Sequence, residues 1–404
     1  MKLILLSGGS GKRLWPLSNN QRSKQFIKVL RHEDHLESMV QRVWRQLTAL
    51  GLKNDTYIAT GANQATILKD QLGINDDQII TEPTRRDTFP AIALATSYLS
   101  SKVHADLDET VVILPVDPYV DVEFFNRIKD LDTLLNASHA TLGLIGIAPT
   151  VPSEKYGYIV PKQLDSIEVK EFKEKPNQLL AKQLISEGAM WNAGVFGFKL
   201  TTMHDTLEEL NISTDFDYLV EHYETLPKNS FDYEFVEKQQ NIVFNRYEGY
   251  WKDLGTWNTL TEEMGAKTVG FTSELIDTEN TFVVNETAIP VAVIGTKDLI
   301  VAAGPEGILV SSKEESPRVK ELPASYFESI HFSEADWGHY HSLLDNEQVN
   351  INLYHVLDNK TFVKQLADNQ KVSQAGGQGI IKEHAGQVEV SGIKDFNFLI
   401  ITEK

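Results

Sequence analysis

The chain of 404 residues contains no cysteine, and charges of one sign predominate. Without cysteine, disulfides, thiolate metal sites and cysteine nucleophiles are all excluded. The 57 acidic residues outnumber the 38 basic residues and give a formal net charge of −19 at pH 7. This negative charge argues against general binding to nucleic acid or to an anionic membrane surface. We therefore expect neither kind of partner. Against this negative background, a local cluster of basic residues indicates a site for an anionic ligand.

Long apolar runs are also missing. Only Lys2 and the short apolar run Leu3–Leu6 precede the first glycines, which is too little for a signal peptide. No apolar stretch approaches the length of a membrane span. We therefore expect a cytoplasmic protein without membrane association. The length leaves room for one large α/β domain and a smaller one.

The opening segment joins an apolar run to a cluster of glycines. Leu3–Leu6 predicts a buried first strand, and Gly8, Gly9 and Gly11 follow it. Glycines let the backbone approach a ligand and turn N–H groups toward it. Four cations come next: Lys12, Arg13, Arg22 and Lys24. This arrangement is typical of a polyphosphate site, although a tight turn alone gives the same glycines, and the spacing matches neither the P-loop nor the G-x-G-x-x-G pattern.

Strand and helix patterns alternate along most of the chain. The expected strands include 3–6, 56–59, 110–114 and 141–148, and the expected helices include 36–50, 89–101, 126–137, 178–187 and 202–210. This alternation predicts an α/β domain with a mostly parallel mixed sheet, whose ligands bind at the carboxyl ends of the strands. From about residue 268 short strands separated by turns replace the helices. We place domain boundaries after residues 266 and 322, giving segments 1–266, 267–322 and 323–404.

The residues after the glycines resemble a known signature. The glycines with their continuation Arg13–Ser18 resemble the G-G-x-G-x-R-L-x-P-L signature of nucleoside-diphosphate-sugar pyrophosphorylases. Ser23–Phe26 resembles the P-K-Q-F that follows it in that family, with Ser23 in place of proline. Further matching segments in the family's order extend the resemblance over residues 3–257. It is closest to the members that are mannose-1-phosphate guanylyltransferases. The resemblance implies a Rossmann-like nucleotidyltransferase domain over residues 1–266.

The resemblance implies a nucleotide site built from two segments. Thr81–Ala91 resembles E-P-x-x-R-N-T-A-P-A, with Asp87 in place of asparagine and Phe89 in place of alanine. A helix N-cap at Asp87 or Thr88 is the structural alternative. Arg13 and Lys24 are implied to hold the β- and γ-phosphates. The full set of implied nucleotide-binding residues is Leu6, Gly8, Gly9, Gly11, Lys12, Arg13, Lys24, Glu82, Arg86 and Asp87.

Two aspartates are candidates for binding Mg²⁺. Asp117 follows the apolar run Val112–Leu114, at the ligand end of the expected sheet. Asp253 lies in Trp251–Trp257, which resembles the family's W-x-D-x-G-[TS]-W segment, whose aspartate is the partner metal ligand. Pro118 replaces the histidine usual in guanylyltransferases. An ordinary loop aspartate or helix N-cap is the alternative reading of Asp117.

The sugar-phosphate half of the site matches three further family segments: Y-G-Y-I at 156–159, F-x-E-K-P at 172–176 and W-N-[SA]-G-[IM]-F at 191–196. The resemblance implies that Gly157, Glu174 and Asn192 bind the sugar. Lys175 is implied to bind its phosphate and to be catalytic together with Arg13 and Lys24. An edge strand with alternating charges is the alternative for 170–175. Phe231–Lys238 resembles [IF]-D-Y-x-[VI]-x-E-K without implying a role for a single residue.

The resemblance implies transfer of a nucleotidyl group from GTP to mannose 1-phosphate, giving GDP-mannose and pyrophosphate with Mg²⁺ as cofactor. A homodimer is expected. Because Asp87, Phe89 and Pro118 depart from the guanylyltransferase pattern, UTP, dTTP or CTP and sugars such as glucose 1-phosphate stay open. A regulatory subunit without catalysis is disfavoured, since the implied catalytic residues are all present.

The C-terminal third resembles other modules. Val291–Val301 resembles the V-x-V-I-G-x-x-D-L-x-V string of guanylyltransferases and implies a β-helix-like appendage over 267–322. Residues 336–340 resemble the start of the cupin found in bifunctional phosphomannose isomerase relatives. Its metal site needs clustered histidines, whereas here the histidines look scattered: His331, His339, His341, His355 and the isolated His384. We therefore expect a degenerate, structural or oligomer-forming tail over 323–404, and an isomerase activity is the less favoured alternative.

Overall fold

The computed structural model describes residues 1–9, 12–328, 331–335 and 337–404, which form two compact units. Gly11 and Asp336 lie outside the described residues. The first unit consists of Met1–Gly8, Val40–Ala65 and Asn75–Asp253, and the second of Gly9–Met39, Thr66–Ile74 and Leu254–Lys404. This division differs from the expected boundary after residue 266, because the segment Gly9–Met39 folds with the C-terminal part of the chain. The boundaries along the sequence stay predictions.

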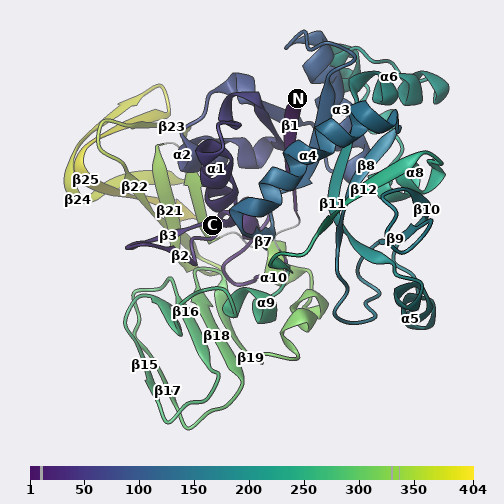
Figure 1. Ribbon diagram of the computed structural model, residues 1–404. Helices are drawn as coiled ribbons and strands as arrows, with labels where there is room; N and C mark the ends of the chain where they lie inside the picture. Colours follow the sequence, from purple (N-terminus) through teal and green to yellow (C-terminus); the bar gives the residue numbers. More distant parts are fainter. Residues whose placement is uncertain (10–11, 329–330, 336) are drawn as a thin grey trace. The chain divides into compact units, whose positions relative to one another are not determined.

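A nine-stranded mixed sheet forms the centre of the first unit (Figure 1). Its order is β10 (Val169–Lys173), β9 (Tyr158–Pro161), β11 (Met190–Lys199), β6 (Thr110–Pro115), β1 (Lys2–Ser7), β4 (Thr56–Gly61) and β5 (Ile79–Glu82), with β8 (Leu142–Ile147) on β11 and β12 (Ile242–Tyr247) on β8. Pairing is parallel around β1 and antiparallel around β11. A separate two-stranded sheet pairs β7 (Pro118–Val120) with β13 (Trp251–Asp253). The expected Rossmann-like architecture is confirmed.

Helices cover both faces of this sheet. They are α1 (Met39–Ala49), α3 (Thr88–Ser101), α4 (Val122–Ser138), α5 (Gln178–Ser186), α6 (Leu200–Glu209), α7 (Phe216–Glu221) and α8 (Phe231–Glu234). Helices α3, α6, α7 and α8 share one apolar core with alternate residues of the strands, such as Ile4 and Ile113. Helix α4 packs closely on β8 and β11, where Gly143 and Gly197 leave room for Leu131: a Cβ on either glycine would lie less than 3 Å from that side chain. The strands are therefore apolar on both sides, as a doubly covered sheet requires.

The second unit contains two small parallel sheets stacked through valines. One sheet is β14 (Thr268–Gly270), β16 (Phe282–Asn285), β18 (Leu299–Gly304) and the antiparallel β19 (Gly307–Ser312), and the other is β15 (Ser273–Ile276) with β17 (Val291–Ile294). Val283, Val293 and Val301 are buried in one cluster. This is the expected β-helix-like region. The unit also holds the hairpin β2 (Leu30–His32) and β3 (His35–Glu37), α9 (Trp257–Thr261), α10 (Ser325–Glu328) and, except for Ala65, α2 (Ala65–Leu72).

The signature segment, defined here as residues 12–26, packs within the second unit. Trp15 is buried in a cluster with Val319 and Phe327, and its carbonyl accepts a hydrogen bond of 3.0 Å from Trp257 Nε1. The turn before β19 fits against it closely, because a Cβ on Gly307 would lie 2.8 Å from the Trp15 ring. Residues between Trp257 and Phe327 therefore support the segment that carries Arg13 and Lys24.

Two buried polar groups fix the same segment. The Arg22 guanidinium donates to both carboxylate oxygens of Glu286, at 2.6 and 2.9 Å, and its side chain is only 9% exposed. The Glu306 carboxylate, 3% exposed, accepts from Asn19 Nδ2 at 2.9 Å and from the backbone N–H groups of His331 and Phe332. Arg22 is thus a structural cation, in contrast to its expected place among the phosphate-binding cations.

The chain ends in an antiparallel six-stranded sheet. Its strands are β20 (Phe332–Ala335), β21 (Gly338–Asp345), β22 (Val349–Val356), β23 (Thr361–Gln365), β24 (Gln370–His384) and β25 (Gln387–Glu403). Three of the histidines that look scattered in the sequence lie together: the ring centroid of His339 is 5.1 Å from that of His341 and 5.0 Å from that of His355. Burial and these two neighbours lower the pKa of His339 to about 4. The description of these histidines as scattered is therefore wrong, because adjacent strands bring them together.

No helix among the described residues is long and apolar enough to cross a membrane.

The Arg22–Glu286 pair predicts a large asymmetry between two glutamate substitutions. Glu286→Gln leaves a buried guanidinium without a counter-charge and should lower the free energy of unfolding by about 3 kcal/mol. Glu279→Gln removes the partner of Lys297 in an ion pair whose two side chains are mostly exposed, and should change nothing measurable. Urea unfolding of both variants tests this. Equal stability of Glu286→Gln and the wild type would mean that the pair does not hold the signature segment.

Candidate active site

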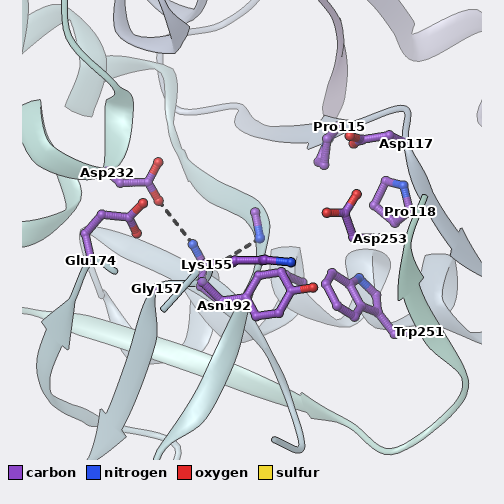
Figure 2. A pocket seen from close by; sticks show the side chains of 13 residues that line it. Pro115, Asp117, Pro118, Lys155, Gly157, Glu174, Asn192, Asp232, Trp251 and Asp253 are labelled. Atoms are coloured by element: carbon purple, nitrogen blue, oxygen red, sulfur yellow. Dashed lines mark hydrogen bonds between the residues drawn. The ribbon is translucent and has the colours of Figure 1, made fainter. Parts of the chain in front are cut away.

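One pocket of the first unit collects most of the residues predicted for the sugar-phosphate and metal sites (Figure 2). Its lining comprises Pro115, Asp117, Pro118, Lys155, Tyr156, Gly157, Glu174, Asn192, Ala193, Gly194, Asp232, Trp251 and Asp253. The acidic side chains occupy two ends: Glu174 and Asp232 lie at one, and Asp117 and Asp253 at the other.

The two aspartates at the second end come from neighbouring segments. Asp117 lies between β6 and β7, and Asp253 ends β13, where it pairs with Pro118 across the two-stranded sheet. Burial together with the charges of Asp253 and Asp117 raises the pKa of Tyr156 to about 12. The Tyr156 hydroxyl therefore stays protonated at neutral pH. The negative charges of both carboxylates therefore act on the Tyr156 hydroxyl.

Tyr156 and Trp251 add aromatic rings to the lining of the same pocket, and the ring of Trp191 packs on Tyr156. The Tyr156 ring centroid is 4.8 Å from that of Trp191 and 5.5 Å from that of Trp251. The Trp191 indole donates to the Tyr158 hydroxyl at 3.0 Å, which fixes the ring plane. These rings give the pocket an apolar wall of the kind against which a sugar ring packs.

Contacts with Glu237 and Lys175 hold Glu174 at the end of the pocket that it shares with Asp232. It follows β10, its side chain is 3% exposed, and its backbone N–H donates to Glu237 at 2.9 Å. Its carboxylate also pairs with the ammonium of Lys175. Gly157 lies beneath, since a Cβ there would be 2.7 Å from Glu174 Oε2 and 2.6 Å from the Phe172 ring. Glycine is required at 157 for this carboxylate to occupy its place.

Lys175 itself does not line the pocket. Burial lowers the pKa of its ammonium, but the hydrogen bond to Glu174 together with the negative charges of Glu174 and Asp232 outweighs burial and leaves the pKa raised. The side chain is half exposed and charged at neutral pH. It is therefore adjacent to the pocket through Glu174, in keeping with the predicted contact to a substrate phosphate.

Asn192, in β11, is connected to α8 at the first end of the pocket. Its side-chain oxygen accepts the backbone N–H of Gly194 at 3.1 Å, and its amide nitrogen donates to Asp232 Oδ1 at 3.2 Å (Figure 2). Gly194 has a φ of +74°, a conformation that glycine adopts without strain. Asn192 is 7% exposed, so its amide is held in one orientation.

Glu82, Arg86 and Asp87, predicted at the nucleotide, have structural partners in the first unit. Tyr223 donates to Glu82 at 2.8 Å, and burial raises the pKa of that carboxyl. The Arg86 guanidinium donates to the Leu226 carbonyl at 2.8 Å. Asp87 is the N-cap of α3 and accepts the Thr88 N–H at 2.8 Å. The N-cap alternative for this position is thus observed, and nucleotide binding by the three stays a prediction.

The remaining predicted nucleotide residues divide between the two units. Leu6 and Gly8 lie in and just after β1 of the first unit. The members of the second unit are Gly9, Lys12, Arg13 and Lys24. Arg13 is exposed, and the Lys12 ammonium lies 5.1 Å from the Phe327 ring. Their role at a triphosphate stays a prediction.

Sequence reasoning assigned no role to Asp232, Lys155 or Trp251, all of which line the pocket. Asp232 stands in the segment that resembles [IF]-D-Y-x-[VI]-x-E-K, so a signal existed. Its spacing from Glu174 and Asn192 along the chain gives no indication that the three side chains meet.

Comparison with known proteins agrees with the fold. The Nucleotidyl transferase family model matches residues 2–268, and a MannoseP isomerase/GMP-like beta-helix domain model matches residues 275–323. The chain therefore belongs to the nucleotidyl transferase family. The family resemblance drawn from the signature is confirmed, and the protein is an enzyme of the nucleotidyltransferase class.

Two individual proteins and one solved structure are also similar to most of this chain. An Escherichia coli mannose-1-phosphate guanylyltransferase is 30% identical over 79% of this chain and 74% of its own length. The xanthan biosynthesis protein XanB of Xanthomonas campestris pv. campestris (strain B100) is 28% identical over 83% of this chain and 74% of its own. A crystal structure from Thermus thermophilus, described as a mannose-1-phosphate geranyltransferase, superposes with a TM-score of 0.65 at 29% identity, over 79% of this chain and 97% of that one.

Enzymes of this family generally use a divalent metal ion. Within the described part of this chain, no group of three or more histidine, cysteine or acidic side chains is arranged to hold a metal. A pair of carboxylates such as Asp117 and Asp253 is nevertheless sufficient for Mg²⁺, which usually takes one or two carboxylates together with waters and substrate phosphates.

The close packing over Gly157 predicts that Gly157→Ala is destabilising. The added methyl group meets the Phe172 ring and the Glu174 carboxylate, and overpacking of this kind costs about 1–3 kcal/mol. Gly376→Ala is a matched control, because a Cβ there meets nothing within 4 Å and its φ is not positive. Thermal unfolding of both variants is the measurement. A Gly157→Ala protein as stable as Gly376→Ala would show that Glu174 does not rest on the glycine.

Proposed function

We propose that the protein transfers a guanylyl group from GTP to mannose 1-phosphate, producing GDP-mannose and pyrophosphate. The observation that carries this proposal is one pocket that has Glu174, Asn192 and Asp232 toward one end and Asp117 and Asp253 at the other. The relatives named mannose-1-phosphate guanylyltransferase support the choice of substrates. Other nucleotides and sugars of the same reaction class are outcomes of the test below.

The sugar 1-phosphate is proposed to bind at the end of the pocket that holds Glu174 and Asn192. A buried carboxylate accepts and an amide NH₂ donates, which suits the hydroxyl groups of a hexose. Gly157 lets the sugar lie on the backbone. The ammonium of Lys175, adjacent to Glu174, binds the phosphate of the sugar.

The nucleoside triphosphate is proposed to bind through the glycines and cations of the first 24 residues. Backbone N–H groups at Gly8, Gly9 and Gly11 contact the phosphates. Arg13 and Lys24 hold the β- and γ-phosphates, where negative charge accumulates as pyrophosphate leaves. The further contacts proposed for the nucleotide are those of Leu6, Lys12, Glu82, Arg86 and Asp87.

The metal proposed for this reaction is Mg²⁺, held by Asp117 and Asp253. Hard oxygen ligands are what Mg²⁺ prefers, and the two aspartates share one end of the pocket. When bound, the ion supplies charge neutralisation for the phosphates that meet there. Tyr156 stays a neutral hydrogen-bond donor beside it, because burial keeps the pKa of its hydroxyl high.

The reaction needs no general base. The sugar phosphate is already ionised at neutral pH, and one of its oxygens forms a bond to the α-phosphorus while the bond from that phosphorus to the bridging oxygen of pyrophosphate breaks. The protein's task is to hold two mutually repelling anions in line. A homodimer and a cytoplasmic location complete the proposal.

A panel of nucleoside triphosphates and sugar 1-phosphates tests the substrates. We expect GTP with mannose 1-phosphate to give the highest kcat/KM among GTP, UTP, dTTP and CTP combined with mannose or glucose 1-phosphate. Pyrophosphate release in the presence of Mg²⁺ is the readout. A different preferred pair would refute the assignment of base or sugar and retain the reaction class, whereas no release with any pair would refute catalysis.

A further inference from the structure

We propose that Asp232 is a third side chain that binds the sugar 1-phosphate, and that the Asp232 carboxyl is protonated and uncharged when it does so. Binding of the sugar phosphate would then be coupled to uptake of a proton by this carboxyl group. The inference rests on the proposed function, and it adds a residue and a proton that the sequence did not indicate.

The position of Asp232 is set by a rigid element. It is the second residue of α8, which follows the N-cap Ser230. Phe231 is fully buried, its backbone N–H donates to Thr88 Oγ1 at 2.8 Å, and its ring centroid lies 5.0 Å from that of Phe196. Since the preceding residue is locked into the core, the Asp232 carboxyl is held at the pocket wall.

The orientation of Asn192 identifies which of its atoms faces Asp232. The backbone N–H of Gly194 is only a donor, so the atom that it contacts must be the amide oxygen of Asn192. The amide nitrogen is therefore the atom that lies 3.2 Å from Asp232 Oδ1. One oxygen of Asp232 is thus occupied as an acceptor.

The charges around Asp232 are unbalanced. Glu174 and Asp87 are negative, whereas Lys175 is the positive group near Asp232 and is already paired with Glu174. Lys155 also lines the pocket. Burial, followed by the charge of Glu174, raises the pKa of Asp232 to about 7, and Lys175 offsets this only partly. Near neutral pH, Asp232 therefore exists in both protonation states.

A bound sugar phosphate favours the protonated state for two reasons. The incoming phosphate adds negative charge to a pocket that already holds Glu174, which raises the cost of a second carboxylate. A protonated carboxyl also donates a hydrogen bond, whereas a carboxylate only accepts. The sugar end would then offer its ligand one anionic acceptor, Glu174, and one neutral carboxyl, Asp232.

The test compares the pH dependence of the wild type with that of Asp232→Asn, whose amide is uncharged at every pH and can donate. If only protonated Asp232 binds the sugar, the KM for mannose 1-phosphate in the wild type should rise about fivefold from pH 7 to pH 8, because the competent fraction falls accordingly. The KM of Asp232→Asn should stay constant over this range and remain near the wild-type value at pH 7. The KM for the nucleotide should not follow the same profile.

Asp165→Asn is the matched control, because it removes the same charge from an exposed loop of the same unit. It should reproduce the wild-type profile. An Asp232→Asn profile identical to that of the wild type would overturn the proposal, as would a tenfold or greater loss of sugar-phosphate affinity in this variant at pH 7. If the wild type and Asp232→Asn both turn over, the proposed function stands whichever of these results is found.

A second measurement uses the unmodified protein and tests the proton directly. Mannose 1-phosphate is added at pH 7 in the presence of an α,β-methylene analogue of GTP, which cannot release pyrophosphate. An indicator dye should report uptake of about half a proton per site, since a group with a pKa near 7 is half protonated beforehand. Binding without proton uptake would overturn the proposal and leave the proposed function standing.

Discussion

The constraint on which the site depends is mutual repulsion among carboxylates. Glu174, Asp232, Asp117 and Asp253 all line one pocket of an acidic protein, and the proposed substrate is itself anionic. Like charges in a partly buried site destabilise one another unless cations or protons compensate. Figure 2 shows the four as two pairs at opposite ends of the pocket, Glu174 with Asp232 and Asp117 with Asp253. The account assigns a divalent metal to one pair, and a lysine and a proton to the other.

Contacts within the second unit hold the signature segment, residues 12–26, in one conformation. The signature segment begins with the exposed cations Lys12 and Arg13, and most of the residues that follow them in it are buried. The restraint comes from distant parts of the chain: Glu286 fixes Arg22, Glu306 fixes Asn19, and Phe327 covers Trp15. The C-terminal third, in which no catalytic group is recognised, therefore holds the segment that carries the two proposed phosphate ligands Arg13 and Lys24.

Much of the fold could be predicted because local patterns determine it. The expected helix over 126–137 is present as α4 (Val122–Ser138), and the expected strand over 110–114 is β6 (Thr110–Pro115). Local sequence also indicated the possible helix cap at Asp87. The short helices α7 and α8 were missed, since Phe216–Glu221 and Phe231–Glu234 offer too few residues for a helical period and depend on packing against α3.

The parts of the site that sequence reasoning missed depend on tertiary contacts. Arg22 looked like a phosphate ligand because charge is visible in the sequence, whereas its partner Glu286 comes more than 250 residues later. Asp232 lies within a segment that matches the family, but its place in the pocket depends on two distant residues. Glu174 follows β10, and Asn192 lies in β11. The histidines at 339, 341 and 355 meet only because β21 and β22 pair in register. A motif identifies a residue from its neighbours in the sequence. It does not identify a residue whose role depends on contacts with distant segments of the chain.

The central claim is that the acidic pocket divides into a metal-binding end and a sugar-binding end. The most direct test is a crystal structure with GDP-mannose and Mn²⁺, collected at a wavelength where manganese scatters anomalously. The account predicts an anomalous peak within about 2.2 Å of a carboxylate oxygen of both Asp117 and Asp253, with the hexose against Gly157 and in contact with Glu174, Asn192 and Asp232. A peak bound instead by Glu174 and Asp232, or a hexose away from Gly157, would contradict the account.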